Sequence, residues 1–256
     1  MRATRRSVLA LVLALLGLLP ASALPAAAVA LRPALPPVVF HGDRAERVVA
    51  LTFDDGYNVA ACAAILAILE RDEVPATFFP VGEAVGWHPA FWRLVDADGY
   101  PIGDHSLTHP FMTRLSYADQ LAQLVDSRAL ITGVLGHPMT PLFRPPYGAA
   151  DATTLAAARA AGFAALVFWD TSAADTSLHG TPAEMIRDAE RGRDGSIILL
   201  HCGPAVTPQI LPAIIAWYRA AGYGFRTVPE LLGLPGRAPS WPSRCPRMVD
   251  LDARPC

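Results

Sequence analysis

The sequence predicts an α/β domain with a parallel sheet, and three observations lead there. Seven short apolar runs typical of strands alternate with stretches whose apolar residues recur at helical spacing. That alternation favours parallel strands joined by crossover helices. Carboxylates, histidines or an arginine also follow several of the runs directly. In a (β/α) barrel the carboxyl ends of the strands share one edge, where active sites are built, so the chemistry is expected at that edge.

The first strand, residues 48–53, leads into residues 52–56 (TFDDG), where a glycine permits a sharp exit from the sheet. Two adjacent carboxylates at a strand end repel each other, so a cation is expected beside them. Further strands, the first of them with its turn, are expected at residues 76–82, 100–104, 142–144, 163–169, 196–200 and 224–228.

Helices are expected between these strands, at residues 59–70, 88–97, 116–135, 151–161, from residue 181 onward, and at residues 208–221. Two of the helix starts carry explicit signals. Ser116 is placed as an N-cap, with Asp119 at the third helical position. Thr181 is followed by Pro182, a residue that suits the first helical turn.

Composition bounds the class of protein. The chain has 256 residues, of which 52% are hydrophobic and 17% charged, so it holds enough apolar material for the core of one large domain. Lys and Arg form no stripe, so a nucleic-acid partner is not expected. No repeat or low-complexity segment suggests a second domain.

Residues 1–30 are interpreted as a secretory signal peptide. Three arginines precede the apolar residues 7–19, and small residues allow cleavage after Ala23 or Ala30. The apolar stretch is short and Pro20 interrupts it, so no stable membrane span is expected in the mature form. Removing the signal takes the net charge from −2 to about −5. The protein is predicted to be secreted, either extracellular or associated with the cell wall.

The remaining chain divides into a Pro/Ala linker at residues 31–46, a catalytic domain at residues 47–230 and a C-terminal tail at residues 231–256. An exported chain with four cysteines is expected to form disulfides. The cysteines are Cys62, Cys202, Cys245 and Cys256. Three pairings are open, although the tail would benefit from a bridge of its own. No CxxC spacing supports a zinc–cysteine site.

Two pairs of polar residues stand out as candidate metal ligands. Asp54 and Asp55 taken alone could form only a turn. His105 and His109 are four residues apart and can share one metal ion, although surface histidines explain that spacing about as often. One carboxylate and two histidines, however, are a common ligand set for a catalytic divalent ion with open positions.

Two cationic candidates complete the set. Arg144 opens residues 144–148 (RPPYG), which could be only a rigid turn, but its guanidinium comes where a carboxylate needs a partner. His201 follows the apolar residues 197–200, where a lone histidine is often a satisfied core residue. Its place at a strand end favours a functional role.

Four motifs occur in order: residues 52–56 (TFDDG), 105–109 (HSLTH), 144–148 (RPPYG) and 199–201 (LLH). Together they resemble the motifs of the polysaccharide deacetylases, the family-four carbohydrate esterases that share the chitooligosaccharide-deacetylase homology domain. The resemblance covers about residues 47–230. It implies a distorted, TIM-barrel-like (β/α)7 barrel and metal-dependent removal of N- or O-acetyl groups from sugars.

The resemblance also implies a role for each matching residue. Asp55, His105 and His109 would bind the metal ion, usually Zn2+, with Co2+ or another divalent ion as the alternative. Asp54 would act as the general base, oriented and kept ionised by Arg144.

The other implied roles concern the substrate. Tyr147 would hold the tetrahedral oxyanion with its backbone N–H, and His201 would protonate the leaving amine. Leu199 would line the pocket for the acetyl methyl group, and Trp169 is placed among the substrate contacts.

One motif departs from the family pattern W-x-x-D-x-x-D-W. Residues 169–176 read WDTSAADT, with Ser172 in place of the first aspartate and Thr176 in place of the closing tryptophan. Asp175 matches the second aspartate, which in the family supports the acid histidine. The missing tryptophan removes the usual sugar-stacking wall, so the choice of substrate is left open.

Asp104 stands where an asparagine is common in the family, a change expected to alter local charge but not metal ligation. The remaining tryptophans are expected to be packing residues rather than sugar platforms. They are Trp87, Trp92, Trp217 and Trp241.

The sequence therefore predicts a secreted, metal-dependent hydrolase that removes N-acetyl groups from a GlcNAc-containing glycan of the chitin or peptidoglycan type. Its partner is an acetylated polysaccharide or oligosaccharide, and its oligomeric state is left open. Two alternatives remain. One is an O-acetyl esterase acting on acetylxylan, and the other is a catalytically impaired glycan-binding module with the same fold. No HExxH motif supports a metalloprotease.

Overall fold

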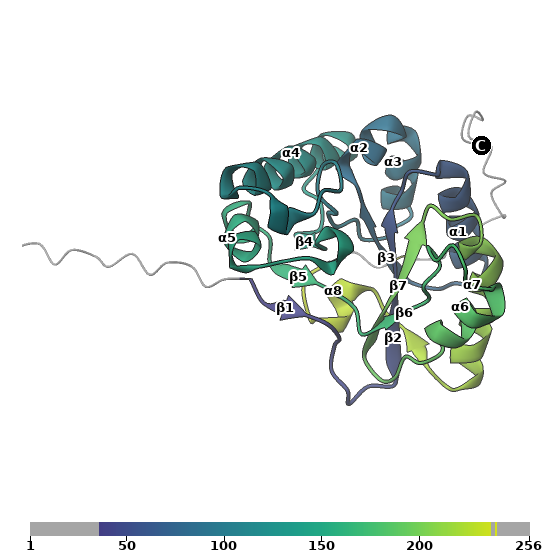
Figure 1. Ribbon diagram of the computed structural model, residues 1–256. Coiled ribbons are helices and arrows are strands. Elements are labelled where there is room, and N and C mark those ends of the chain that lie inside the picture. The colour runs from purple at the N-terminus through teal and green to yellow at the C-terminus, as the bar shows by residue number, and fades with distance from the viewer. Residues whose placement is uncertain (1–35, 237–238, 240–256) are drawn as a thin grey trace, which may run out of the picture. The chain divides into compact units, whose positions relative to one another are not determined.

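The computed structural model describes residues 36–236 and residue 239, and within them helices alternate with strands (Figure 1). The strands are β1 (Val38–Val39), β2 (Val48–Asp55), β3 (Ala76–Pro80), β4 (Leu142–Phe143), β5 (Ala165–Val167), β6 (Thr171–Ser172), β7 (Ser196–Cys202) and β8 (Gly224–Phe225). The helices are α1 (Val59–Arg71), α2 (Gly82–Trp87), α3 (Pro89–Ala97), α4 (Tyr117–Leu135), α5 (Ala152–Ala160), α6 (Pro182–Ala189), α7 (Thr207–Ala220) and α8 (Val228–Leu231).

The named strands pair only in parallel within the described residues. One sheet has the order β3-β2-β7-β6, with β8 paired to the start of β2, and the other has the order β1-β5-β4. Residues 102–104 join the two sheets, because Ile102 bridges Phe78 of β3 while Asp104 bridges Phe143 of β4. The predicted α/β architecture with parallel strands, a distorted (β/α)7 barrel, is confirmed.

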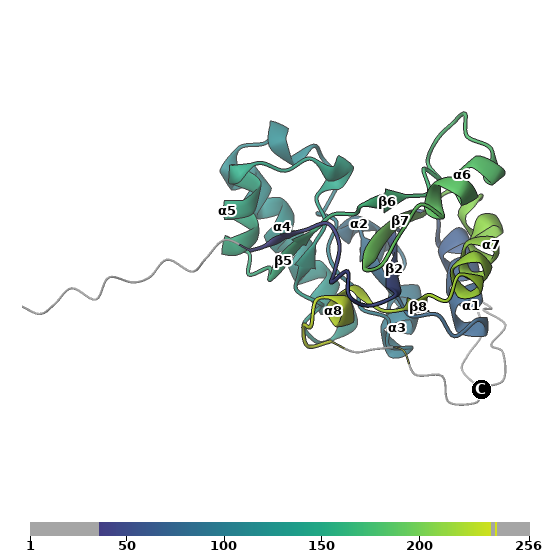
Figure 2. The same cartoon turned by 90° about the horizontal axis from the view of Figure 1, so that it is seen from below.

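The helices cover the outside of the strands. Figures 1 and 2 place α1 beside α7 on one flank and α4 beside α5 on another. Helix α4 begins as predicted, since Asp119 donates its backbone N–H to Ser116 at 3.2 Å, and it ends at Gly136 in the left-handed conformation. Strand β2 is buried from Val49 to Asp54, which explains its continuous rather than alternating apolar run.

The structure differs from the sequence prediction at four places. Of the predicted strand at residues 224–228, only Gly224–Phe225 is a strand, and Val228 already begins α8 because Thr227 caps that helix. Residues 100–104 form isolated bridges rather than a regular strand, since Pro101 has no N–H to donate. The predicted turn after β3 is the short helix α2. The predicted strand at residues 163–169 is shorter, and a second strand, β6, follows a break at Asp170. The Asp170 carboxylate accepts from the Ile197 N–H and from Arg44, which bends the chain there.

A disulfide joins Cys62 of α1 to Cys202 of β7. Of the three open pairings, the structure therefore selects the one that links these two cysteines. Cys245 and Cys256 lie outside the described residues, as do the predicted signal peptide and most of the tail. The described part of the predicted linker contains β1, which pairs with β5.

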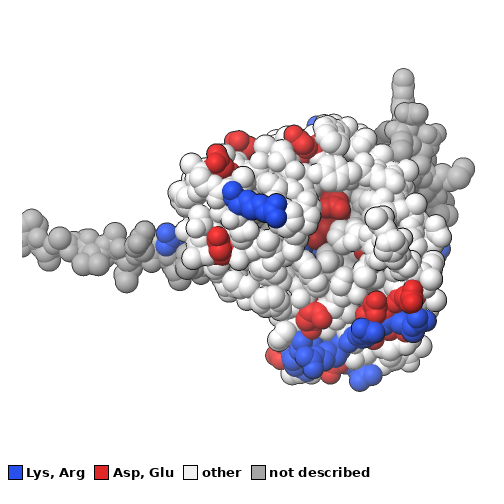
Figure 3. Space-filling view, in the orientation of Figure 1, with Lys and Arg blue, Asp and Glu red and all other residues white. Residues whose placement is uncertain are grey.

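Among the described helices, none is both long and apolar enough to cross a bilayer. On the face shown in Figure 3, arginines and acidic residues lie interspersed in a band along one edge, and most of the remaining face is uncharged. Acidic side chains also lie in a hollow near the middle of that face.

Candidate metal centre and active site

The predicted site residues come together at the edge of the barrel where the strands end. Asp54 and Asp55 close β2, His105 and His109 follow the bridging residues 102–104, Arg144 follows β4, and His201 lies in β7. Part of this arrangement follows from strand register, because Asp54 pairs with His201 along the ladder between β2 and β7.

Asp55, His105 and His109 form a group whose ligand atoms all lie within 4.8 Å of one another. The Asp55 carboxylate is 3.8 Å from His105 Nε2 and 3.6 Å from His109 Nε2. His105 Nδ1 lies 2.7 Å from the backbone carbonyl of Arg144, which can only accept a hydrogen bond. The proton of neutral His105 is therefore held on Nδ1, and Nε2 is left with its lone pair facing the group.

Burial sets the protonation states of these ligands. It lowers the pKa of His105 and of His109, so both imidazoles are neutral and have a lone pair to offer. Burial also raises the pKa of Asp55, with nearby Asp54 adding to the rise and His201 opposing it. A carboxylate with two neutral imidazoles suits zinc and similar divalent ions, and such an ion would relieve the repulsion between the two aspartates.

Asp54 and Arg144 form a buried ion pair. Arg144 donates from Nη1 to the Asp54 carboxylate at 2.7 Å and to the Thr52 hydroxyl at 2.9 Å. The rest of the guanidinium donates to the carbonyls of Val167 and Phe168, and it lies 4.3 Å from the centre of the ring of Phe79. Arg144 is fully buried and Asp54 nearly so, hence neither charge is solvated by bulk water.

Asp175 holds His201 at two points and is itself bound by Thr207. One carboxylate oxygen lies 2.8 Å from His201 Nδ1, and the other accepts the His201 backbone N–H at 2.8 Å. That second oxygen also accepts from the Thr207 hydroxyl at 2.6 Å. Burial lowers the pKa of His201, but the hydrogen bond and charge of Asp175 outweigh it, and the net shift is upward.

The three predicted substrate contacts lie around this group. Tyr147 is exposed and has left-handed backbone angles, φ 60° and ψ 9°. Leu199 is buried in β7, in register with Ser172 of β6. Trp169 lies beside the Arg144 guanidinium and against Gly148, where any Cβ would approach its ring to 3.1 Å.

The backbone around the site is strained. Of the six described non-glycine residues with positive φ, five lie at or beside the candidate site. They are Asp55, Ser106, His109, Tyr147 and Ala174. Each such conformation costs on the order of 1–3 kcal/mol and persists only where surrounding contacts enforce it. Two of the three candidate metal ligands are thus held in unfavourable conformations.

Some contributors carried no signal in the sequence. Thr207 and Phe79 support Asp175 and Arg144 respectively, but neither belongs to a polar motif. Trp87 is 59% exposed, so the expectation that it is a packing residue was wrong. Trp92 is 1% exposed, as expected of a packing residue. Trp241 lies outside the described residues.

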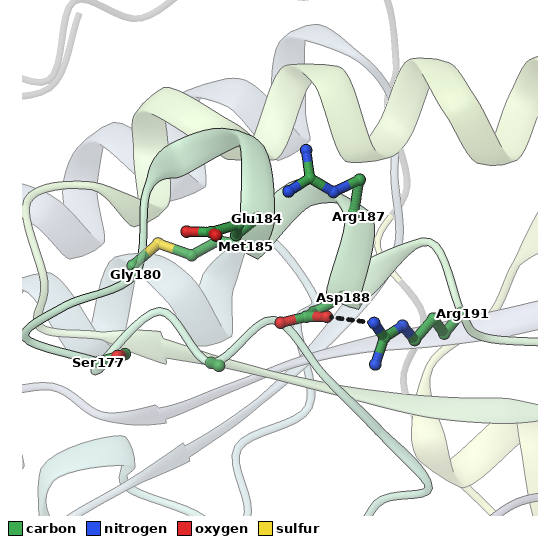
Figure 4. Close-up of a pocket in the computed structure, with 8 residues that line it drawn as sticks. Ser177, Gly180, Glu184, Met185, Arg187, Asp188 and Arg191 are labelled. Atoms are coloured by element: carbon green, nitrogen blue, oxygen red, sulfur yellow. Dashed lines mark ion pairs between the residues drawn. The ribbon is translucent and has the colours of Figure 1, made fainter.

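A separate pocket of about 350 Å3 opens beside α6 (Figure 4). Its lining comes from the loop before α6, from α6 itself and from Arg191 just after it, with an ion pair between Asp188 and Arg191. Ala174, at one end of the lining, precedes Asp175 in the chain, but none of the predicted site residues lines this pocket.

Comparison with known proteins places this arrangement in a family. A family model described as polysaccharide deacetylase matches residues 41–166. A chitooligosaccharide deacetylase of Bradyrhizobium sp. (strain ANU 289) is 32% identical over 157 residues, which cover 61% of this chain and 71% of that protein. The peptidoglycan-N-acetylmuramic acid deacetylase PdaC of Bacillus subtilis is 32% identical over 189 residues, 74% of this chain. The chain spans only 39% of the length of PdaC.

Solved structures agree in fold. The structure of PdaC has a TM-score of 0.66 at 31% identity, covering 74% of this chain and 91% of the other. A pseudoenzyme of the same esterase family from Bacillus anthracis has a TM-score of 0.70 at 27% identity, covering 77% and 69%. The fold therefore occurs in both active and inactive proteins. Taken with the four motifs and the geometry of the site, these similarities show that the chain belongs to the polysaccharide deacetylase family.

Proposed function

We propose that this protein is an exported glycan deacetylase that hydrolyses N-acetyl groups of a GlcNAc-containing polymer, with zinc bound by Asp55, His105 and His109. The grouping of these three ligands beside the Asp54–Arg144 pair is the observation that carries the proposal. Relatives named as peptidoglycan and chitooligosaccharide deacetylases support the substrate class.

The three ligands fit a divalent ion on chemical grounds. They offer one carboxylate and two imidazoles with lowered pKa values, and the Arg144 carbonyl orients the ring of His105. When bound, such an ion polarises the acetyl carbonyl and lowers the pKa of a water molecule. Zinc is our first choice, and Co2+ would fit the same donors.

Asp54 is the group we assign as general base. Its Oδ2 atom lies 3.7 Å from His105 Nε2, so it faces the place where an attacking water would sit. Arg144 binds the other carboxylate oxygen and keeps Asp54 oriented. Because arginine does not lose its proton in proteins, its positive charge stays beside the Asp54 carboxyl group.

His201 is the group we assign as general acid. Asp175 binds Nδ1 and leaves Nε2 to donate a proton to the departing nitrogen. An ester leaving group needs this proton less than an amine does, so a poorly supported histidine would have favoured an O-acetyl esterase. The three contacts to Asp175 therefore support the amide over the ester.

The remaining contacts concern the acetyl group itself. We place the backbone N–H of Tyr147 against the developing oxyanion, which fits the enforced left-handed conformation of this residue. Leu199 supplies an apolar surface for the methyl group, and Trp169 borders the site beside Arg144. The alternative of an inactive binding module is less favoured, because every assigned ionisable residue is present.

The test is acetate release from chitooligosaccharides, peptidoglycan and acetylxylan by the purified protein. Release that stops with a chelator and returns with zinc or cobalt is expected. His201→Ala is expected to reduce release from N-acetyl substrates more than from O-acetyl esters. Equal losses on both would remove the role of His201 as acid. A protein that binds zinc but releases acetate from none of these glycans would contradict the proposed function.

A further inference from the structure

The described loop at residues 173–177, next to the proposed acid, carries no aromatic side chain. Thr176 stands where the family pattern has a tryptophan, and it is exposed, as are Ala174 and Ser177 of the same loop. Small side chains of this kind offer a sugar ring little area for contact. If the protein acts on a glycan as proposed above, an aromatic contact to the sugars beyond the reacting ring would come from another part of the surface.

Tyr57 and Trp87 form an exposed aromatic pair at the same edge of the barrel. Their ring centres are 5.7 Å apart with a 46° tilt, and the two residues are 40% and 59% exposed. Tyr57 comes two residues after Asp55, at the point where the chain leaves β2. Trp87 ends α2, the helix that follows β3.

The pair adjoins the loop that carries the histidine ligands. The first turn of α2 is fixed to this loop, because Gly82 and Glu83 donate their backbone N–H groups to the carbonyls of Ser106 and Leu107.

A second aromatic pair lies on the other side of the histidine loop. Tyr147 stacks on Phe111 with ring centres 3.8 Å apart, and its edge meets His109 at 4.5 Å. The Arg114 guanidinium carbon lies 4.4 Å from the centre of the Phe111 ring, and Phe111 remains partly exposed. In the strand order, residues 102–104 lie between β3 and β4, so the loop that follows them has one aromatic pair on each side.

We propose that Tyr57 and Trp87 form a sugar-binding subsite, in which the indole of Trp87 packs against the apolar face of a pyranose ring neighbouring the ring that is deacetylated. The substrate class is a β-1,4-linked GlcNAc oligomer, long enough to place a further ring on this pair. The inference rests on the proposed function. It places the aromatic contact to the polymer at the ends of β2 and β3 rather than at the loop that contains Thr176.

Two features favour this occupant over a chance exposure. Large aromatic rings are rarely left in water without a partner, and here two exposed rings touch each other beside a candidate catalytic group. Both are also amphipathic, with an N–H or O–H at one edge that can bind sugar hydroxyls while the ring face contacts C–H groups. A glycan presents both kinds of surface to one platform.

The test measures binding separately from turnover. Chitopentaose and chitobiose are titrated by calorimetry into the zinc-loaded full chain carrying Asp54→Asn, with and without Trp87→Ala. We expect Trp87→Ala to weaken chitopentaose binding about tenfold, with a smaller loss for chitobiose, because the shorter ligand reaches the platform less. Trp87→Phe should recover most of the affinity, because it restores a ring face.

Trp217→Ala serves as the matched control, since Trp217 is a partly exposed tryptophan of α7 that packs on Tyr218. It should bind chitopentaose as the parent does. Equal effects of Trp87→Ala and Trp217→Ala, or no binding of chitopentaose by the parent, would overturn the subsite. The parent variant could bind chitopentaose through Trp87 while the same chain with Asp54 restored releases no acetate. That result would support the subsite and contradict the proposed deacetylase activity.

Discussion

Two carboxylates at the edge of the barrel, Asp54 and Asp175, have different basic partners, and this difference suits them to different roles. Asp54 is paired with Arg144, whose proton is permanent, in a region that solvent does not reach. Asp175 is paired with His201, whose proton can leave, and the imidazole remains partly accessible. The first pair fixes a charge and the second fixes the position of a movable proton. Under the proposed mechanism, one edge would thus combine a base with a permanent cationic partner and an acid that can release its proton.

The largest expected effect on activity comes from removing the charge of Asp54. Asp54→Asn should lower kcat for acetate release by about 10²- to 10⁴-fold, because the amide that replaces the carboxylate cannot act as a general base. Zinc content, measured by atomic absorption, should match that of the parent, since the three ligands are intact. Activity close to that of the parent would show that Asp54 is not the base.

Replacing the arginine of the same ion pair should lower the stability of the folded protein. Arg144→Met leaves the Asp54 charge buried without its partner, which is expected to lower the free energy of unfolding by about 3–5 kcal/mol. Urea unfolding of the metal-free protein measures this value. The double variant Asp54→Leu with Arg144→Met should recover part of the loss. If single and double variants are equally unstable, the unpaired charge is not the cause.

The pair of Asp175 and His201 should determine how activity depends on pH. Because Asp175 raises the pKa of His201, Asp175→Asn lowers it, and the protonated acid is then lost at a lower pH. The descending, alkaline limb of the kcat/KM profile should move to lower pH. Activity on N-acetyl substrates at pH 8 should fall about 10²-fold. An unmoved alkaline limb would mean that the limb reports some group other than His201.

A third buried carboxylate, Asp104, has no cationic partner in hydrogen-bond contact among the described residues. Burial raises its pKa to about 7, although Ser127 and the Ser106 N–H donate to it. The raised value means that Asp104 favours folding below its ordinary pKa of 3.8 and that this contribution is lost as pH rises toward 7.

Asp104→Asn removes that dependence and should give the smallest effect of the four. Its stability relative to the parent should improve between pH 4 and pH 7 and then level off. A net gain of about 1 kcal/mol is expected at pH 8, because the unpaired amide hydrogen offsets part of the benefit. Urea unfolding of chelator-treated protein at several pH values measures it. A constant difference at every pH would show that Asp104 is ionised throughout in the folded state.

Much of the fold and the grouping of site residues could be predicted, because the spacing of apolar residues and the short sequence motifs are local properties. The strand that ends at Asp55 and the capped helix at Ser116 are each encoded within a dozen residues. The Cys62–Cys202 pairing and the support of Asp175 by Thr207 could not be predicted, since both depend on register between distant elements. The exposure of Trp87 was missed because residues after β3 form a short helix that carries this tryptophan to the rim.

The pairing of β2 with β7 has a consequence for the order in which the protein matures. All three candidate metal ligands belong to the chain up to residue 109, whereas His201 lies in β7, far along the sequence. Contacts between such distant segments form slowly because a long loop must close first. A chain still being made therefore contains all three candidate ligands before it contains His201. Under the proposed mechanism, the proton donor would join the site only when β7 docks beside β2.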